Sequence, residues 1–143
     1  MKILVTGGAG FIGSHMVDLL LERGFEVRVI DNLTSGRESN LAQHAREPAL
    51  ALERGDIRQL AAQSPIFRGA RFVVHFAGMG DIVPSIERPL DYMSTNVLGT
   101  VHVLECARAN GVEKLVYAAS SSCYGLAEVP TREDQRIAPQ YPY

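Results

Sequence analysis

The sequence is poor in several features that would each indicate a particular class of protein. It has two cysteines, Cys106 and Cys123, in apolar surroundings and without C-x-x-C spacing. We therefore expect reduced thiols, and neither a disulfide framework nor a zinc site. No apolar run reaches the roughly 18 residues of a membrane span, and the first residues already have the pattern of a buried strand rather than of an export signal. These features favour a cytoplasmic protein.

The sequence also lacks a charge pattern that would suit nucleic acid. The formal net charge is -2, and the basic residues are scattered singly along the chain. No positive stripe is available on which a phosphodiester backbone could lie, so we expect no nucleic-acid partner. The 143 residues are 46% apolar and 21% charged, without repeats or low-complexity segments. This length and composition predict one globular domain rather than a disordered or fibrous chain.

What the sequence does contain is a regular alternation of short apolar runs with helical patterns. The apolar runs predict strands at residues 2–6, 26–30, 50–54, 71–75 and 114–118. Helical spacing predicts helices at residues 11–23, 37–46 and 90–110, and glycines and prolines predict loops at residues 78–89 and 120–143. This alternation is typical of an α/β fold with a doubly wound parallel sheet. We expect a Rossmann-like strand order of 3-2-1-4-5, with any ligand across the carboxyl ends of the strands.

A glycine-rich turn joins the first strand to the first helix. Gly7, Gly10 and Gly13 have the spacing G-x-x-G-x-x-G. Gly7 permits a tight turn, Gly10 lets the backbone approach a diphosphate, and Gly13 allows close packing of the helix. The helix then presents free N–H groups and a positive dipole end. Glycine turns also occur without ligands, but between a strand and a helix the pattern favours dinucleotide binding.

Asp31 stands at the end of the second strand. Its carboxylate can accept hydrogen bonds from a ribose diol and would repel a 2′-phosphate, which favours NAD over NADP as the cofactor. Two alternatives stay open. Asp31 can be an ordinary loop aspartate, and Arg37 could reach back toward a 2′-phosphate if its loop folds inward.

These features together resemble the extended short-chain dehydrogenase/reductase family, in particular its nucleotide-sugar epimerases. The resemblance runs through Thr6-Gly-Gly-Ala-Gly-Phe-Ile-Gly-Ser14, Asp31-Asn-Leu33, Gly55-Asp-Ile57, His75-Phe-Ala-Gly78, the helix segment around Asn96, and Tyr117-Ala-Ala-Ser-Ser-Ser-Cys-Tyr-Gly125. It implies a set of NAD contacts at Gly7, Gly10, Phe11, Ile12, Gly13, Asp31, Asn32, Asp56, Ile57, Phe76, Ala77, Gly78 and Asn96.

Three of these motif positions have a structural alternative. Asp56, which the resemblance assigns to the adenine, could be a helix N-cap. Asn96 could serve a hydrogen bond to backbone instead of the cofactor. His75 ends an apolar strand, and we expect a packed, hydrogen-bonded histidine without a role in the chemistry.

The resemblance also implies the reaction. In the family, a tyrosine whose pKa is lowered by a nearby lysine takes a proton from a sugar hydroxyl while hydride passes to NAD, and a serine shares the hydrogen bond. Alignment on Cys123-Tyr-Gly125 identifies Ser120 as that serine, and the lead-in Pro139-Gln-Tyr-Pro142 identifies Tyr143 as the tyrosine. The lysine of the Tyr-x-x-x-Lys motif is not within the 143 residues. We therefore expect residues 1–143 to be an NAD-binding domain that lacks the substrate domain and turns over little or no substrate. No metal is implied.

The reaction class depends on residue 122. Dehydratases and decarboxylases of the family place a glutamate there, whereas this sequence has Ser122, which favours a UDP-hexose 4-epimerase. A dehydratase, decarboxylase or reductase of the same family, or a non-catalytic NAD-binding module, remains the alternative. The resemblance also implies a nucleotide-sugar substrate and a homodimer through residues 90–110, which we expect to be impaired in this chain.

Overall fold

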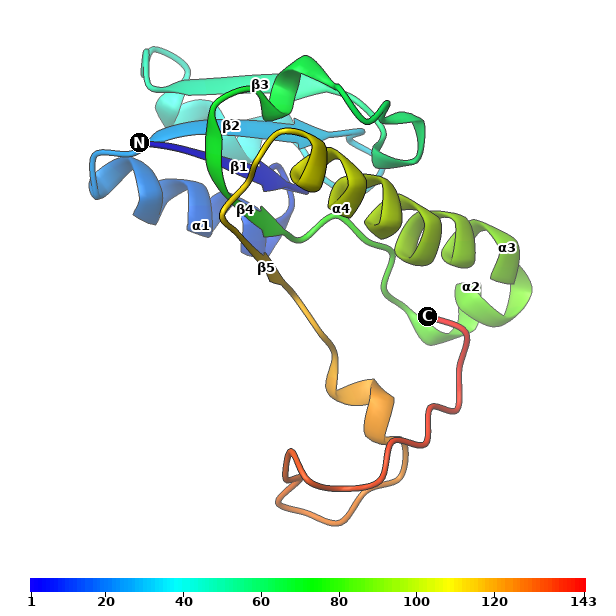
Figure 1. Ribbon diagram of the computed structural model, residues 1–143. Coiled ribbons are helices and arrows are strands. Elements are labelled where there is room, and N and C mark those ends of the chain that lie inside the picture. Colours follow the sequence, from blue (N-terminus) through cyan, green and yellow to red (C-terminus); the bar gives the residue numbers. More distant parts are fainter.

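A five-stranded parallel sheet forms the centre of the protein, with the strand order β3-β2-β1-β4-β5 (Figure 1). The computed structural model describes all residues from 1 to 143. The strands are β1 (Lys2–Thr6), β2 (Glu26–Asp31), β3 (Leu50–Arg54), β4 (Ala70–His75) and β5 (Lys114–Tyr117). Every neighbouring pair is parallel. The expected Rossmann-like fold and its strand order are thus confirmed.

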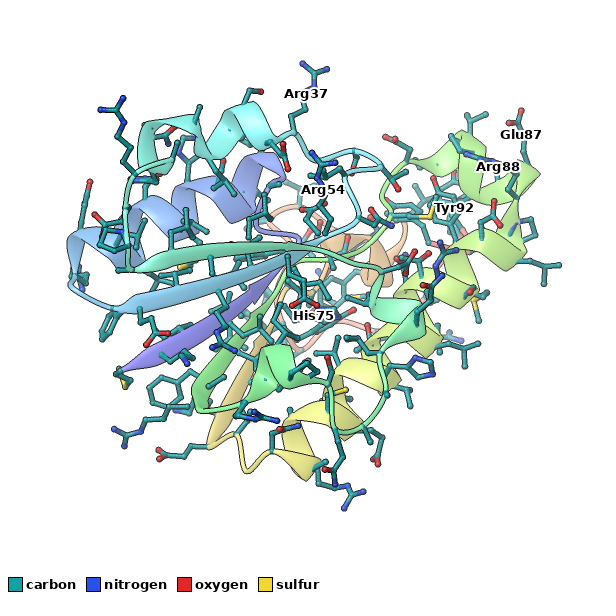
Figure 2. The ribbon with its side chains drawn as sticks, turned by 90° about the horizontal axis from the view of Figure 1, so that it is seen from above. Arg37, Arg54, His75, Glu87, Arg88 and Tyr92 are labelled. Atoms are coloured by element: carbon teal, nitrogen blue, oxygen red, sulfur yellow. The ribbon has the colours of Figure 1, made fainter.

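Helices cover both faces of this sheet, as right-handed crossovers require. The α-helices are α1 (Phe11–Glu22), α2 (Ile82–Glu87), α3 (Pro89–Tyr92) and α4 (Thr100–Ala109). Short 3₁₀ helices are η1 (Glu38–His44), η2 (Ile57–Gln59), η3 (Pro65–Phe67) and η5 (Ser121–Tyr124), and η4 (Met93–Gly99) is a π-helix between α3 and α4. Figures 1 and 2 show α1 on one face of the sheet and α4 on the opposite face.

The hydrophobic core has one layer on each face because side chains alternate along a strand. In β1, Ile3 and Val5 face α1, whereas Leu4 faces α4. The α1 layer contains Ile3, Val5, Ala9, Val17, Leu20, Val27, Val29, Leu41 and Val74. The α4 layer contains Leu4, Ile30, Ile57, Ile66, Phe67, Ala70, Val73, Val103, Cys106 and Ala107. Both layers converge on β1, which is therefore held from two sides.

The structure corrects three sequence-based expectations. The expected loop at residues 78–89 contains helix α2, even though Pro84 lies inside it. The expected helix at 37–46 is the shorter 3₁₀ helix η1. The expected single helix at 90–110 is interrupted by the π-helical turns of η4. The interruption lies where Gly99 packs against Ile57, since a Cβ on Gly99 would lie 2.6 Å from Ile57 Cδ1.

Three further features concern the cysteines, the helix lengths and the last residues of the chain. Cys106 is buried and Cys123 is half-buried, and both are free thiols. No helix has the length and apolar character needed to cross a membrane. After β5 the chain leaves the sheet, and residues 118–143 form a largely irregular excursion that includes η5 (Figure 1).

Candidate cofactor site

A pocket of about 370 Å³ opens at the carboxyl ends of β1, β2 and β4. Its position follows from the topology, because the chain crosses to opposite faces of the sheet on the two sides of β1. The pocket is lined by Gly7, Gly10, Ile30, Asp31, Asn32, Thr34, Ser35, Gly36, Gly55, Ile57, Arg58, Phe76, Ala77, Gly78, Met79, Gly80, Asp81, Arg88, Asp91, Tyr92 and Thr95.

The glycine turn forms one wall of the pocket through its backbone. Gly7 has φ +70°, and a Cβ there would lie 2.7 Å from Ala77 N, so only glycine fits without movement of the backbone. A Cβ on Gly13 would lie 2.1 Å from Gly7 O. Gly13 is thus needed for close packing of α1 against the turn.

The start of α1 suits a diphosphate. Gly10 is the N-cap, no side chain caps the helix, and no acidic residue lies in its first turn. The first N–H groups of a helix have no partner inside the helix, and they lie at the positive end of its dipole. A backbone surface without side chains beside this helix end fits the diphosphate of a dinucleotide.

Asp31 anchors the loop at the other end of the glycine turn. The residue is 7% exposed. Oδ2 accepts a hydrogen bond from Ala9 N at 3.0 Å, and Oδ1 accepts one from Leu33 N at 2.8 Å. A Cβ on Gly36 would lie 2.9 Å from both carboxylate oxygens. Each oxygen still has a lone pair free, so Asp31 can accept from a ribose diol while it holds the turn and the loop together.

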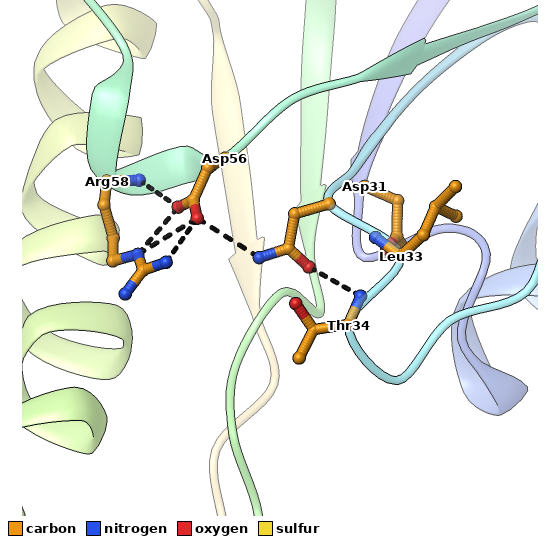
Figure 3. A network of polar contacts seen from close by, with 6 residues as sticks. Asp31, Leu33, Thr34, Asp56 and Arg58 are labelled. Atoms are coloured by element: carbon orange, nitrogen blue, oxygen red, sulfur yellow. Dashed lines mark hydrogen bonds and ion pairs between the residues drawn. The ribbon is translucent and has the colours of Figure 1, made fainter.

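A second carboxylate stands beside the pocket in a charged network (Figure 3). Asp56 Oδ2 lies 2.6 Å from Arg58 Nη2 and accepts from Asn32 Nδ2 at 3.2 Å. The hydrogen bond from the Arg58 side chain is the main cause that lowers the pKa of Asp56 to about 2. Asp56 Oδ1 also accepts from Arg58 N at 2.9 Å, so Asp56 is the N-cap of η2. The N-cap role that the sequence left open is present, and adenine contact stays a prediction.

The structure brings most of the predicted cofactor residues to this pocket. Those that line it are Gly7, Gly10, Asp31, Asn32, Ile57, Phe76, Ala77 and Gly78. Those that do not are Phe11, Ile12, Gly13, Asp56 and Asn96. Phe11 and Ile12 are 78% and 64% exposed at the start of α1, so their side chains extend into solvent and only their backbone belongs to the turn.

The side-chain amide of Asn96 holds Met79, a residue of the pocket wall. Its Oδ1 accepts from Met79 N at 2.7 Å, and its Nδ2 donates to Met79 O at 2.9 Å. Both ends of the amide are therefore engaged with one backbone segment. The alternative of a structural hydrogen bond is observed, and a direct cofactor contact stays a prediction.

Sequence reasoning missed the far end of the pocket. Arg88, Asp91, Tyr92 and Thr95 line it from α3, η4 and the residue before α3, and Figure 2 shows Arg88 and Tyr92 at this end. Tyr92 is buried and its hydroxyl donates to Gly80 O at 2.6 Å. The sequence carried no signal for this role, because Asp91, Tyr92 and Thr95 lie in the expected helix at 90–110 and Arg88 lies in the expected loop at 78–89.

The two predicted catalytic residues are not hydrogen-bonded to one another. Ser120 Oγ accepts from Ser122 N at 3.2 Å and caps η5. The Tyr143 hydroxyl is hydrogen-bonded to Ser122 Oγ instead. Neither Ser120 nor Tyr143 lines the pocket. Their catalytic roles stay predictions.

The fold and the pocket thus define a doubly wound domain with a dinucleotide-type site. Comparison with known proteins then identifies the family. Residues 3–143 match the NAD-dependent epimerase/dehydratase family. The chain therefore belongs to the NAD-dependent epimerase/dehydratase family.

Individual relatives agree with this family. The chain is 40% identical over 151 residues to UDP-glucose 4-epimerase 2 of Oryza sativa subsp. japonica, with 99% of this chain and 36% of the relative covered. The dTDP-glucose 4,6-dehydratase DesIV from Streptomyces venezuelae, solved with NAD and TYD bound, has a TM-score of 0.93 and 38% identity. The UDP-glucose 4-epimerase of Thermus thermophilus, solved in complex with NAD, has a TM-score of 0.89 and 38% identity.

The chain spans less than half the length of these relatives. All 143 residues are covered in both structural comparisons, against 47% of the dehydratase and 46% of the epimerase. The shared part contains the sheet and the pocket described above.

Proposed function

We propose that residues 1–143 form the NAD-binding portion of a nucleotide-sugar 4-epimerase. The observation that carries this proposal is the buried Asp31 carboxylate at a pocket whose other wall is a glycine turn with a free helix end. A carboxylate in this position favours a ribose diol and repels a 2′-phosphate. Arg37, which could have accommodated that phosphate, points outward from the molecule in Figure 2. NAD is therefore favoured over NADP.

Each part of the chain has a separate task in this proposal. The glycine turn and α1 bind the diphosphate, and Asp31 orients the adenosine ribose. Ser120 and Tyr143 are the residues that we propose hold and move the proton of a sugar hydroxyl. NAD, when bound, accepts a hydride from the sugar carbon and returns it.

The reaction class rests on the serine at position 122. A dehydratase needs a further acid or base for elimination, and a neutral hydroxyl at this position does not supply one. Ser122 thus favours simple oxidation and reduction at the sugar C4. The high similarity to DesIV keeps a dehydratase of the same family as the second candidate.

Calorimetric titration of the 143-residue chain tests the cofactor part of this proposal. We expect saturable binding of NAD and weaker binding of NADP. Removing one charge-assisted hydrogen bond costs about 1.5–3 kcal/mol, or roughly 10- to 150-fold in Kd. NAD that lacks the 2′-hydroxyl of its adenosine ribose (2′-deoxy-NAD) should bind more weakly by an amount in this range. This comparison leaves the protein unchanged.

The variant Asp31→Asn, titrated with NAD and with 2′-deoxy-NAD, shows whether Asp31 is the group that recognises the ribose hydroxyl. Its carboxamide nitrogen would face a backbone N–H, because both Asp31 oxygens accept from backbone. The variant should bind NAD weakly and should no longer distinguish NAD from 2′-deoxy-NAD. Asp134→Asn, an exposed aspartate outside the pocket, serves as the control. Absence of NAD binding in the unmodified chain would contradict the proposal. The same ratio of Kd values for 2′-deoxy-NAD and NAD in the unmodified chain and in Asp31→Asn would also contradict it.

A further inference from the structure

His75 is a buried histidine that the proposed chemistry does not use. It ends β4, is 1% exposed, and does not line the cofactor pocket. Its Nδ1 lies 2.5 Å from Thr6 Oγ1 at the end of β1, and its Nε2 lies 2.9 Å from Thr100 Oγ1 at the start of α4. Figure 2 shows its side chain in the interior of the molecule. The imidazole thus joins two strands and a helix.

Counting hydrogens fixes the direction of the hydrogen bond between His75 and Thr100. Thr100 Oγ1 donates its only hydrogen to Asn96 O at 2.7 Å, so it must accept from His75 Nε2. Thr6 Oγ1 accepts from Ala77 N at 3.2 Å, and its own hydrogen is available for His75 Nδ1. The imidazole thus carries a hydrogen on Nε2, and burial, which lowers the pKa of His75 to about 4, keeps the ring neutral with Nδ1 as the acceptor.

Both ends of this chain of hydrogen bonds reach the same pocket wall. At one end Thr6 holds Ala77 N. At the other end Thr100 holds the Asn96 backbone, and the Asn96 amide grips Met79 through two hydrogen bonds. Ala77 and Met79 both line the cofactor pocket. Asn96 lies in the π-helix η4, a type of turn that often marks a functional site.

We propose that His75, as a neutral imidazole between Thr6 and Thr100, is a positioning residue that fixes the 77–79 segment of the cofactor pocket. Both ring nitrogens of His75 have a partner, so one arrangement of the hydrogen bonds is selected over others. With its only hydrogen on Nδ1, the imidazole would face Thr100 Oγ1 through a bare Nε2, and no hydrogen would lie between them because Thr100 donates to Asn96 O. The functional part of this inference rests on the proposed NAD binding.

The first measurement uses the unmodified chain without ligand. Long-range ¹H–¹⁵N spectra distinguish the two neutral tautomers of histidine from the charged form. We expect the Nε2–H tautomer for His75 at pH 7. A protonated imidazole or the Nδ1–H tautomer would overturn the proposal.

Two variants at Thr100 then test the coupling to the pocket. Thr100→Val keeps the shape and removes the hydroxyl, and Thr100→Ser keeps the hydroxyl. In Thr100→Val we expect amide hydrogen exchange of Met79 to accelerate about three- to tenfold and Kd for NAD to rise by a similar factor, as one lost hydrogen bond implies. Thr100→Ser should restore both values. The Val73 amide, in the middle of β4, monitors general destabilisation.

The outcomes separate this inference from the proposed function. Unchanged Met79 exchange in Thr100→Val, equal acceleration at Val73, or failure of Thr100→Ser to restore Met79 exchange would overturn the positioning role. If the unmodified chain binds no NAD, the proposed function fails, and the role of His75 in a cofactor site fails with it. The tautomer and the Met79 exchange rates then still decide whether the hydrogen-bond chain exists. If Thr100→Val weakened NAD binding but left Met79 exchange unchanged, the hydrogen bonds from Thr100 through Asn96 to Met79 would not be the cause, and the inference would be wrong.

Discussion

Mild acid should destabilise this protein through His75. Burial lowers the pKa of His75 to about 4, from 6.5 for an ordinary histidine. Between these two values the unfolded chain binds a proton that the folded chain does not bind. The free energy of unfolding therefore falls as pH falls through this window, and the stability from neutral His75 is fully present only above it.

The size of the effect follows from the same two pKa values. A change from 6.5 to about 4 corresponds to roughly 3 kcal/mol when pH has fallen below both values. Between pH 7.5 and 5.5 the expected loss is about 1.4 kcal/mol. The hydrogen-bond partners of the ring are two neutral threonine hydroxyls, and the Tyr117 ring lies beside it with ring centroids 5.9 Å apart. No carboxylate is hydrogen-bonded to His75 that could compensate for its charge.

Urea unfolding of the unmodified chain and of His75→Gln at pH 7.5, 6.5 and 5.5 measures this loss. The difference in unfolding free energy between the two proteins should shrink by about 1.4 kcal/mol over this range, because the variant has no imidazole to protonate. His15→Gln, which removes an exposed histidine, is the matched control. A difference for His75→Gln that stays constant with pH would refute the reasoning.

Three further predictions concern packing, charge and thiol chemistry. Gly13→Ala should lower stability by more than about 1 kcal/mol in urea unfolding, since its Cβ would lie 2.1 Å from a carbonyl oxygen of the turn, whereas Gly80→Ala, with no atom within 4 Å, should change stability by less than about 0.5 kcal/mol. The unmodified protein should lose stability as Asp56 protonates, between the ordinary pKa of 3.8 and its folded pKa of about 2. Asp56→Asn should remove this loss, and urea unfolding between pH 4 and about pH 2 would measure the difference. Cys123 should react with iodoacetamide before Cys106, because burial raises the pKa of the Cys106 thiol; mass spectrometry of the labelled protein would detect the reverse order.

The sequence predicts the sheet well because each strand depends on local patterns. The apolar runs at residues 2–6 and 50–54 coincide with β1 and β3, and glycine in the left-handed region ends α1 at Gly24, which has φ +76°. The alternation of strand and helix then leaves few topologies, since parallel crossovers have one hand. Contacts between residues far apart in the sequence are therefore not needed to predict the strand order.

Helix α2 and π-helix η4 were not predicted from the sequence, for two different reasons. Pro84 reads as a loop residue, yet it lies within the first turns of α2, where proline is tolerated. The π-helical turns of η4 accompany the contact of Gly99 with Ile57 and the Thr100 hydrogen bond to Asn96. Neither contact has a periodic signature in the sequence.

The two halves of the proposed site differ in how strongly the fold determines them. Asp31 is fixed by two backbone N–H groups within the first strand–helix–strand unit, and β1 behind it is paired on both sides. Ser120 follows β5, which is an edge strand paired only with β4, and the Tyr117 side chain at its end is 56% exposed. Local motifs therefore suffice to predict where the ribose would bind. The position of Ser120, in contrast, depends on the pairing of the edge strand β5 with β4.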